Sequence, residues 1–105
     1  MRAIACLCVG AAMVLGASDT RAKTIRVEIS KLLFAPVEIK ARVGDEIEWV
    51  NNDFVAHTAT ARDDRFDVEL EPGKSGRVTL EKAGAVDYYC RYHPNMTGRV
   101  SVSGQ

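Results

Sequence analysis

The sequence predicts an all-β domain built as a sandwich of two sheets, and three observations carry this prediction. Apolar and polar residues alternate with a period of two through most of the chain after Lys23, as in strands with one buried face. Turn-forming residues separate these runs at intervals of about ten residues. No stretch shows the apolar stripe of an amphipathic helix. We therefore expect short strands joined by tight turns.

The expected strands follow one another along the chain with their apolar side chains facing inward. In the first of them, Ile25, Val27 and Ile29 alternate with polar residues. Further strands are expected at 39–43, 47–49, 78–80, 86–88 and 100–102. The turn signals between them lie at 44–45, 51–53, 72–73, 83–84 and 98. Trp49 occupies an inward position and is expected in the core, whereas the charged stretch 63–67 is expected to be a solvated loop.

The N-terminus has the parts of a secretory signal peptide. A basic start at Arg2 precedes an apolar run over residues 3–17 and a small, polar end at residues 18–22. The run is shorter than the roughly 20 strongly apolar residues of a membrane span and is rich in Ala and Gly, which argues against an anchor. We therefore expect residues 1–22 to be removed, with cleavage before Lys23 or, alternatively, after Ser18, leaving a single domain over residues 23–105 with no membrane span.

The expected mature segment contains a single cysteine, Cys90, because Cys6 and Cys8 lie in the signal peptide. No internal disulfide is then possible, and a leftover cysteine in a secreted chain requires another explanation. The full chain has 14 basic and 14 acidic residues, of which residues 1–22 hold two and one, so the mature net charge is about −1. No basic stripe is present, which excludes nucleic acid as an expected partner.

The soft and imidazole side chains of the mature segment form one compact set. Three of them lie within seven residues, at Cys90, His93 and Met96, and the fourth is His57. A thiolate, two imidazoles and a thioether are the donors of a mononuclear electron-transfer copper site, with His₂Cys in a trigonal plane and a weak axial Met. A Cys-x₂-His-x₂-Met loop between two strands can place three donors around one point, and His57 would arrive from another strand end. We therefore predict one bound copper ion at these four residues.

Other interpretations of these residues are weaker. A lone Cys, Met or His is often an ordinary core or structural residue, but here that would have to hold for all four positions at once. Structural zinc sites generally use two or more Cys with paired His spacing, and c-type haem requires Cys-x-x-Cys-His; the mature segment has neither pattern. A thiol nucleophile at Cys90 would leave Met96 without a role. We therefore expect an electron carrier rather than an enzyme.

At these residues the chain resembles the cupredoxins, the small blue copper proteins. The similarity runs through residues 34–39, 43–53, 72–75 and 88–100, and the short ligand loop with Pro94 after His93 is most similar to that of the amicyanins. The resemblance implies an eight-stranded Greek-key β-sandwich, copper binding through Nδ1 of His57 and His93, and emergence of the His93 edge through an apolar patch. Thr58 and Arg91 depart from the family pattern, in which an Asn often follows the first His and ties the two ligand segments together.

The function implied is that of a periplasmic type 1 copper protein. Such a monomer would shuttle single electrons between a dehydrogenase, for example an amine dehydrogenase, and a c-type cytochrome or oxidase. The electrons would leave through His93, which is expected beside Tyr92, Pro94 and Phe54. The alternative is a periplasmic copper-binding protein for trafficking, storage or sensing. Such proteins often use several Met or His residues at exposed sites, which a closed set with one Met argues against.

Overall fold

Residues 21–104 are described by a computed structural model, and they form two β-sheets with no helix. The predicted signal peptide lies almost entirely outside the described residues. Within residues 21–104, no helix is long and apolar enough to cross a membrane. The strands are β1 (Thr24–Ser30), β2 (Leu33–Ala35), β3 (Glu38–Arg42), β4 (Glu46–Asn51), β5 (His57–Ala61), β6 (Asp67–Leu70), β7 (Ser75–Thr79), β8 (Gly84–Cys90) and β9 (His93–Ser103). The predicted all-β sandwich is confirmed.

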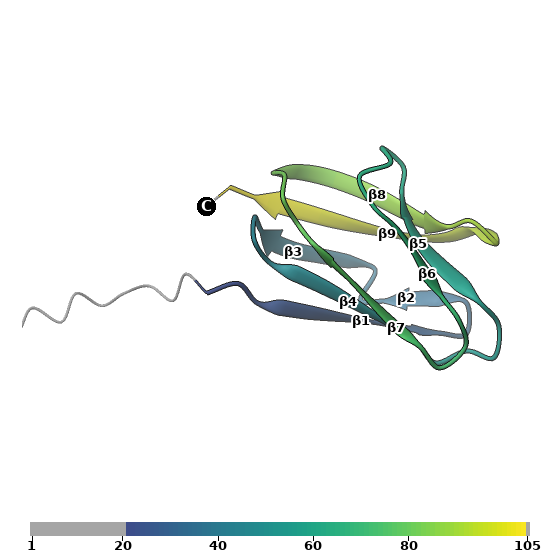
Figure 1. Ribbon diagram of the computed structural model, residues 1–105. Helices are drawn as coiled ribbons and strands as arrows, with labels where there is room; N and C mark the ends of the chain where they lie inside the picture. Colours follow the sequence, from purple (N-terminus) through teal and green to yellow (C-terminus); the bar gives the residue numbers. More distant parts are fainter. Residues whose placement is uncertain (1–20, 105) are drawn as a thin grey trace, which may run out of the picture.

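The two sheets have the strand orders β2-β1-β4-β7 and β3-β9-β8-β5-β6 (Figure 1). The described residues thus form nine strands, one more than expected, and the segment after the first turn divides into two. β2 pairs with β1 in one sheet, whereas β3 pairs with β9 in the other. Pro36 lies between them, and because proline has no backbone N–H it suits a point where the chain leaves one ladder for another.

Two strands beside the candidate metal centre, β5 and β6, lie outside the runs in which the sequence alternates between apolar and polar residues. Every residue of β5 is buried, so its sequence His-Thr-Ala-Thr-Ala has no exposed face to create a period of two. β6 contains Asp67, which the sequence places in a charged stretch expected to be a solvated loop. Asp67 is exposed, as expected, but it lies in a strand rather than a loop, and its carboxylate accepts a hydrogen bond from the Thr60 hydroxyl across the β5–β6 pair.

The core between the sheets is organised around an aromatic cluster. Trp49 of β4 is fully buried, as expected, and its ring lies 5.5 Å from that of Tyr88 on β8 in the opposite sheet. Tyr88 also packs edge-on against Phe34, with ring centroids 4.7 Å apart, and Phe66 lies 5.4 Å from Trp49. Edge-to-face pairs at these separations are favourable for aromatic rings. The cluster therefore packs the two sheets against each other close to the strand ends that carry the candidate site.

Gly98 is a strand residue rather than the turn that the sequence predicted. It lies in the middle of β9 and is paired with Tyr88 of β8. A Cβ at this position would lie 2.4 Å from Tyr88 Cζ and 2.5 Å from its hydroxyl oxygen. The side chain of Tyr88 therefore occupies the space above Gly98, and close packing is the reason for glycine here.

Replacing Gly98 by alanine is therefore expected to destabilise the domain by about 1–3 kcal/mol through overpacking against Tyr88. The measurement is the free energy of unfolding in urea, with Gly104→Ala as control because a Cβ at Gly104 meets no heavy atom within 4 Å. Equal stability of the two variants would contradict the packing role of Gly98.

Candidate metal centre

Three of the four predicted ligands meet at one end of the sandwich. His57 is the first residue of β5, Cys90 the last of β8 and His93 the first of β9. The β8–β9 turn lies at the end of the sandwich opposite the C-terminus (Figure 1). β5 pairs with β8 in antiparallel fashion, and Thr60 faces Tyr89. This register brings the start of β5 beside the end of β8. The sheet register thus places residues 33 positions apart in contact.

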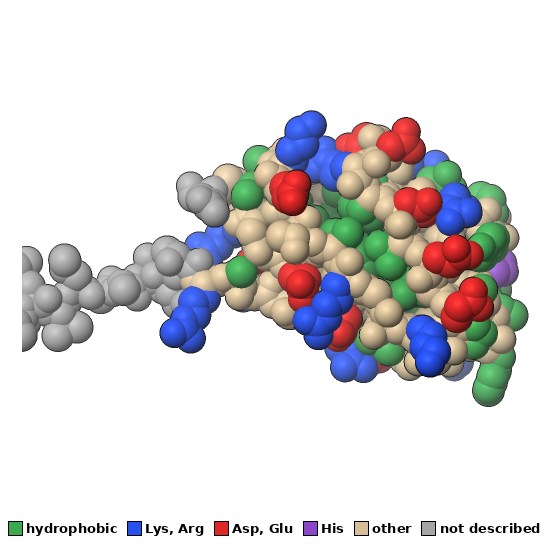
Figure 2. Space-filling model, in the orientation of Figure 1, with side chains coloured by type: hydrophobic (Ala, Val, Ile, Leu, Met, Phe, Trp, Pro, Cys, Tyr) green, Lys and Arg blue, Asp and Glu red, His purple; other side chains and the backbone are tan. Residues whose placement is uncertain are grey.

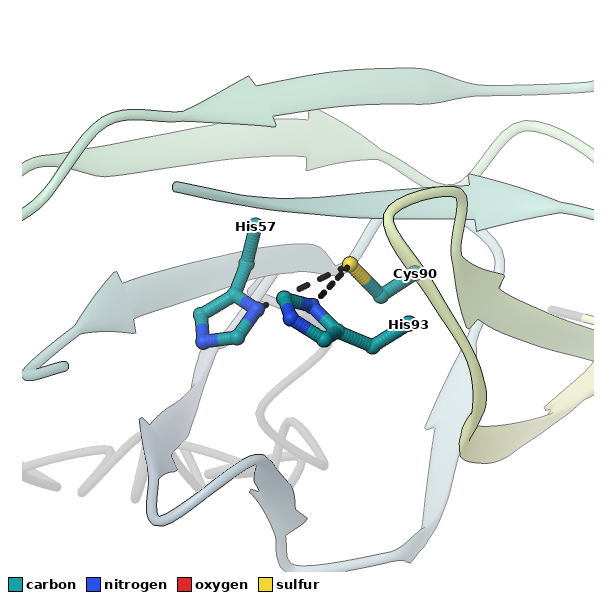
Figure 3. Close-up of side chains that lie close together, drawn as sticks. All are labelled: His57, Cys90 and His93. Atoms are coloured by element: carbon teal, nitrogen blue, oxygen red, sulfur yellow. Dashed lines mark hydrogen bonds between the residues drawn. The ribbon is translucent and has the colours of Figure 1, made fainter. Parts of the chain in front are cut away.

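The donor atoms of these three residues point at a common centre (Figure 3). Cys90 Sγ lies 3.6 Å from His57 Nδ1 and 3.7 Å from His93 Nδ1, and all three donor atoms lie within 4.8 Å of one another. His57 and Cys90 are fully buried, and His93 is partly exposed. The arrangement brings together two nitrogens and one sulfur, and of the three residues only His93 reaches the surface.

The separations fit a first-row metal ion in a trigonal plane. Metal–sulfur and metal–nitrogen bonds of about 2.3 and 2.05 Å, separated by 120°, put sulfur and nitrogen about 3.8 Å apart, within about 0.2 Å of the observed separations. The observed 3.6 and 3.7 Å match this spacing. Two imidazole nitrogens with one thiolate are the equatorial donors of a mononuclear electron-transfer copper site. The residues present therefore fit the expected metal.

His57 is held in the tautomer that a metal ligand requires. Its Nε2 lies 2.8 Å from Asp53 Oδ2, and Asp53 also accepts backbone hydrogen bonds from Lys31 at 2.7 Å and Leu32 at 3.0 Å. Partial burial alone would raise the pKa of Asp53, but the bonds from Leu32, His57 and Lys31 together hold it below its usual value. The ionised carboxylate accepts the Nε2 proton, which leaves the Nδ1 lone pair free for the metal.

The surroundings of the Cys90 sulfur suit a metal ligand. Cys90 is the one free cysteine of the described residues, and its Sγ accepts a hydrogen bond from the backbone amide of Thr58 at 3.3 Å. An N–H directed at sulfur stabilises negative charge there. Hydrogen bonding around the cysteine sulfur is also one of the features that tunes a copper site of this kind.

Met96 lies on β9, three residues after His93, and its side chain is 3% exposed. It lines the same surface groove as His93, together with Leu32, Leu33 and Pro94. Its place in the groove that His93 lines is compatible with the expected weak axial thioether. Assignment of the four individual ligands stays a prediction.

The two departures from the family pattern form their own link between the ligand segments. The backbone N–H of Arg91 donates to Thr58 Oγ1 at 2.8 Å, so a hydroxyl replaces the expected amide. The Arg91 guanidinium donates to Asp67 at 3.2 Å. Sequence reasoning missed the roles of Asp53, Thr60 and Asp67. Only Asp53 gave a signal, as an acidic residue four positions before His57 in an expected turn.

Comparison with known proteins agrees with this geometry. The chain matches the cupredoxin-like domain family over residues 3–102. It belongs to the cupredoxin-like family. It is 29% identical over 92 residues to an amicyanin from Paracoccus versutus, a match that covers 82% of this chain and 70% of the relative. The expected cupredoxin membership and amicyanin similarity are confirmed.

Solved structures of cupredoxins share the fold. The reduced Cu(I) form of an amicyanin variant superimposes with a TM-score of 0.68 at 28% identity, over 76% of this chain and 82% of that one. A purple cupredoxin from Nitrosopumilus maritimus gives a TM-score of 0.68 at 26% identity, over 79% of this chain and all of that one. Family and donor set together give copper as the cofactor, as the sequence predicted.

Replacing Asp53 by asparagine is expected to weaken copper binding about 10- to 100-fold. Asparagine keeps an oxygen for the Lys31 amide, but its NH₂ group then takes the place of Oδ2 and donates to His57 Nε2, which favours a tautomer whose Nδ1 carries the proton. The measurement is a competition titration with a chelator, and Asp63→Asn, an exposed site, serves as control. Unchanged affinity in Asp53→Asn would show that the carboxylate does not set the tautomer.

Proposed function

We propose that this protein is a periplasmic type 1 copper electron carrier whose ligands are His57, Cys90, His93 and Met96. The observation that carries the proposal is the buried meeting of two Nδ1 atoms and one Sγ, with His93 alone reaching the surface. Copper, when bound, supplies a one-electron couple between Cu(I) and Cu(II). The chain itself holds the donors in place, excludes water and presents one edge to partners.

Rigid placement is the contribution of the protein to electron transfer. Donors that need not move when the oxidation state changes keep the reorganisation small, and soft sulfur with borderline nitrogen suits both states of the metal. Here the two ligand segments are joined by the Thr58 amide to Cys90 Sγ and by the Arg91 amide to the Thr58 hydroxyl. His57 is further fixed by Asp53.

The surface around His93 suits brief contacts with redox proteins. Figure 2 shows a histidine emerging among hydrophobic side chains at the end of the molecule away from the C-terminus, and since His57 is fully buried this histidine is His93. The exposed apolar side chains include Leu33 at 61%, Phe54 at 99% and Tyr92 at 47%. A small apolar patch with a near-neutral rim favours weak, short-lived encounters.

The similarity to amicyanins supports a proposal for the partners and the compartment. We propose that the carrier, as a monomer, accepts electrons from a periplasmic dehydrogenase, such as an amine dehydrogenase, and passes them to a c-type cytochrome or oxidase. Among the described residues, His57, Cys90 and His93 form a single possible metal cluster, which supports a carrier with one redox centre.

Loading the protein with Cu(II) is expected to give intense visible absorption from thiolate-to-copper charge transfer and a reversible one-electron wave in voltammetry. Cys90→Ser is expected to abolish the colour while the far-ultraviolet circular dichroism of the sandwich is retained. A colourless protein that binds only Cu(I), with no reversible couple, would instead support copper trafficking or storage.

Removal of residues 1–22 is supported by the position of Lys23. Its backbone nitrogen donates to the buried carboxylate of Asp45 at 2.9 Å, and β1 begins at the next residue, Thr24. Cleavage before Lys23 would turn that nitrogen into an ammonium group beside a carboxylate, which strengthens the bond.

Intact mass measurement of the protein exported to the periplasm is therefore expected to give a chain that starts at Lys23. Asp45→Ala is expected to leave this start unchanged and to lower the melting temperature, because the amino group loses its partner. A mature chain that begins at Asp19, or one that keeps residues 1–22, would contradict the proposed boundary.

A further inference from the structure

The inference concerns how this chain replaces the amide that commonly ties the two ligand segments in cupredoxins, and it rests on the proposed copper site. Four residues form a closed circuit of hydrogen bonds next to the donors. Arg91 N donates to Thr58 Oγ1 at 2.8 Å, Thr58 Oγ1 lies 2.9 Å from Thr60 Oγ1, and Thr60 Oγ1 donates to Asp67 Oδ1 at 2.7 Å. The guanidinium of the same Arg91 closes the circuit by donating Nε–H to Asp67 Oδ1 at 3.2 Å.

The direction of each hydrogen bond in the circuit follows from the donor inventory. An ionised carboxylate only accepts, so the single hydroxyl proton of Thr60 goes to Asp67. The hydrogen bonds from Thr60 and Arg91 hold the pKa of Asp67 below its usual value, against the opposing effect of partial burial. With its proton committed, the Thr60 oxygen must accept the proton of Thr58. The Thr58 hydroxyl hydrogen then points toward Thr60, and a lone pair of the Thr58 oxygen faces the Arg91 amide.

The circuit reaches the predicted ligands through the backbone. Thr58 follows His57 and Arg91 follows Cys90, so the bond between Arg91 N–H and Thr58 Oγ1 joins the two ligand segments. A second bond crosses it, from the Thr58 amide to Cys90 Sγ at 3.3 Å. If the Thr58 hydroxyl rotated, the bond from the Arg91 amide to Thr58 Oγ1 would be lost. The backbone around Thr58, whose amide faces the Cys90 sulfur, would then be held less firmly.

Burial indicates which part of the circuit carries this effect. Thr58 is fully buried and Thr60 is 6% exposed, whereas the Asp67 and Arg91 side chains are 53% and 39% exposed. An exposed ion pair alone contributes little. Its role here is to anchor a chain of buried hydroxyl groups, in which each bond polarises the next.

We propose that Thr60 and Asp67, with the Arg91 side chain, are positioning residues of the copper site that fix the rotamer of the Thr58 hydroxyl and thereby the amide–sulfur bond to Cys90. Loss of the circuit weakens that bond and leaves more negative charge on sulfur. Because this favours Cu(II) over Cu(I), the reduction potential falls.

The test compares Thr60→Val with Thr60→Ser. Valine keeps the shape and loses the hydroxyl, whereas serine keeps the hydroxyl and loses a methyl group. In the metal-free protein, Thr60→Val is expected to speed hydrogen exchange of the Arg91 amide about tenfold, while Thr60→Ser changes it less than about twofold. In the copper-loaded protein, Thr60→Val is expected to lower the reduction potential and Thr60→Ser to leave it unchanged.

A second pair of variants tests the exposed end of the circuit. Asp67→Ala is expected to act as Thr60→Val does. Asp87→Ala is the matched control, because Asp87 is 54% exposed and pairs with Arg99 at 3.1 Å in the way that Asp67 pairs with Arg91. It should change neither the exchange rate nor the potential.

Equal effects of Thr60→Val and Thr60→Ser would assign Thr60 to packing and overturn the proposal. Equal effects of Asp67→Ala and Asp87→Ala, or unchanged Arg91 exchange in Thr60→Val, would also overturn it. Exchange measured without metal does not depend on the proposed function. A protein with the expected exchange changes but no copper couple would therefore keep the circuit and refute the electron-carrier role.

Discussion

The pairing of β5 with β8 is the constraint on which the metal centre depends. The backbone partners are Thr60 with Tyr89 and Ala61 with Tyr88, and beyond this point side chains take over as acceptors. The Thr58 amide donates to the Cys90 sulfur, and the Arg91 amide donates to the Thr58 hydroxyl. The sheet therefore opens at its end without leaving these backbone donors unpaired, and at this opening two imidazoles and the Cys90 sulfur converge.

The donors are positioned from three directions, each with a different physical basis. Asp53 sets the tautomer of His57 through a charge-assisted hydrogen bond and also accepts two amides of the β1–β2 turn. The Thr58 link joins the segments of His57 and Cys90. Behind the site, the aromatic contact between Tyr88 and Trp49 clamps the sheets. Because Leu32 of that turn is exposed and lines the groove beside His93, one carboxylate connects His57 with the apolar surface around His93.

Chemical identity and spacing were enough to predict that His57, Cys90 and His93 would meet, because soft ligands are rare and here they are concentrated. Period-two alternation likewise predicted strands with one exposed face. It could not reveal β5, in which both faces are covered, nor the strand role of Gly98, which depends on Tyr88 lying opposite. In the sequence, Thr60 lies in a segment without a strand signal and Asp67 in a charged stretch expected to be solvated. Their function exists only in the register that places them beside Arg91.

The most direct measurement is a crystal structure of the Cu(II)-loaded protein with anomalous scattering recorded at the copper edge. The account predicts a single anomalous peak between His57 Nδ1, Cys90 Sγ and His93 Nδ1, next to Met96. It also predicts that Asp53 remains bonded to His57 Nε2. A peak elsewhere on the molecule, or copper bound without the Cys90 sulfur, would contradict it.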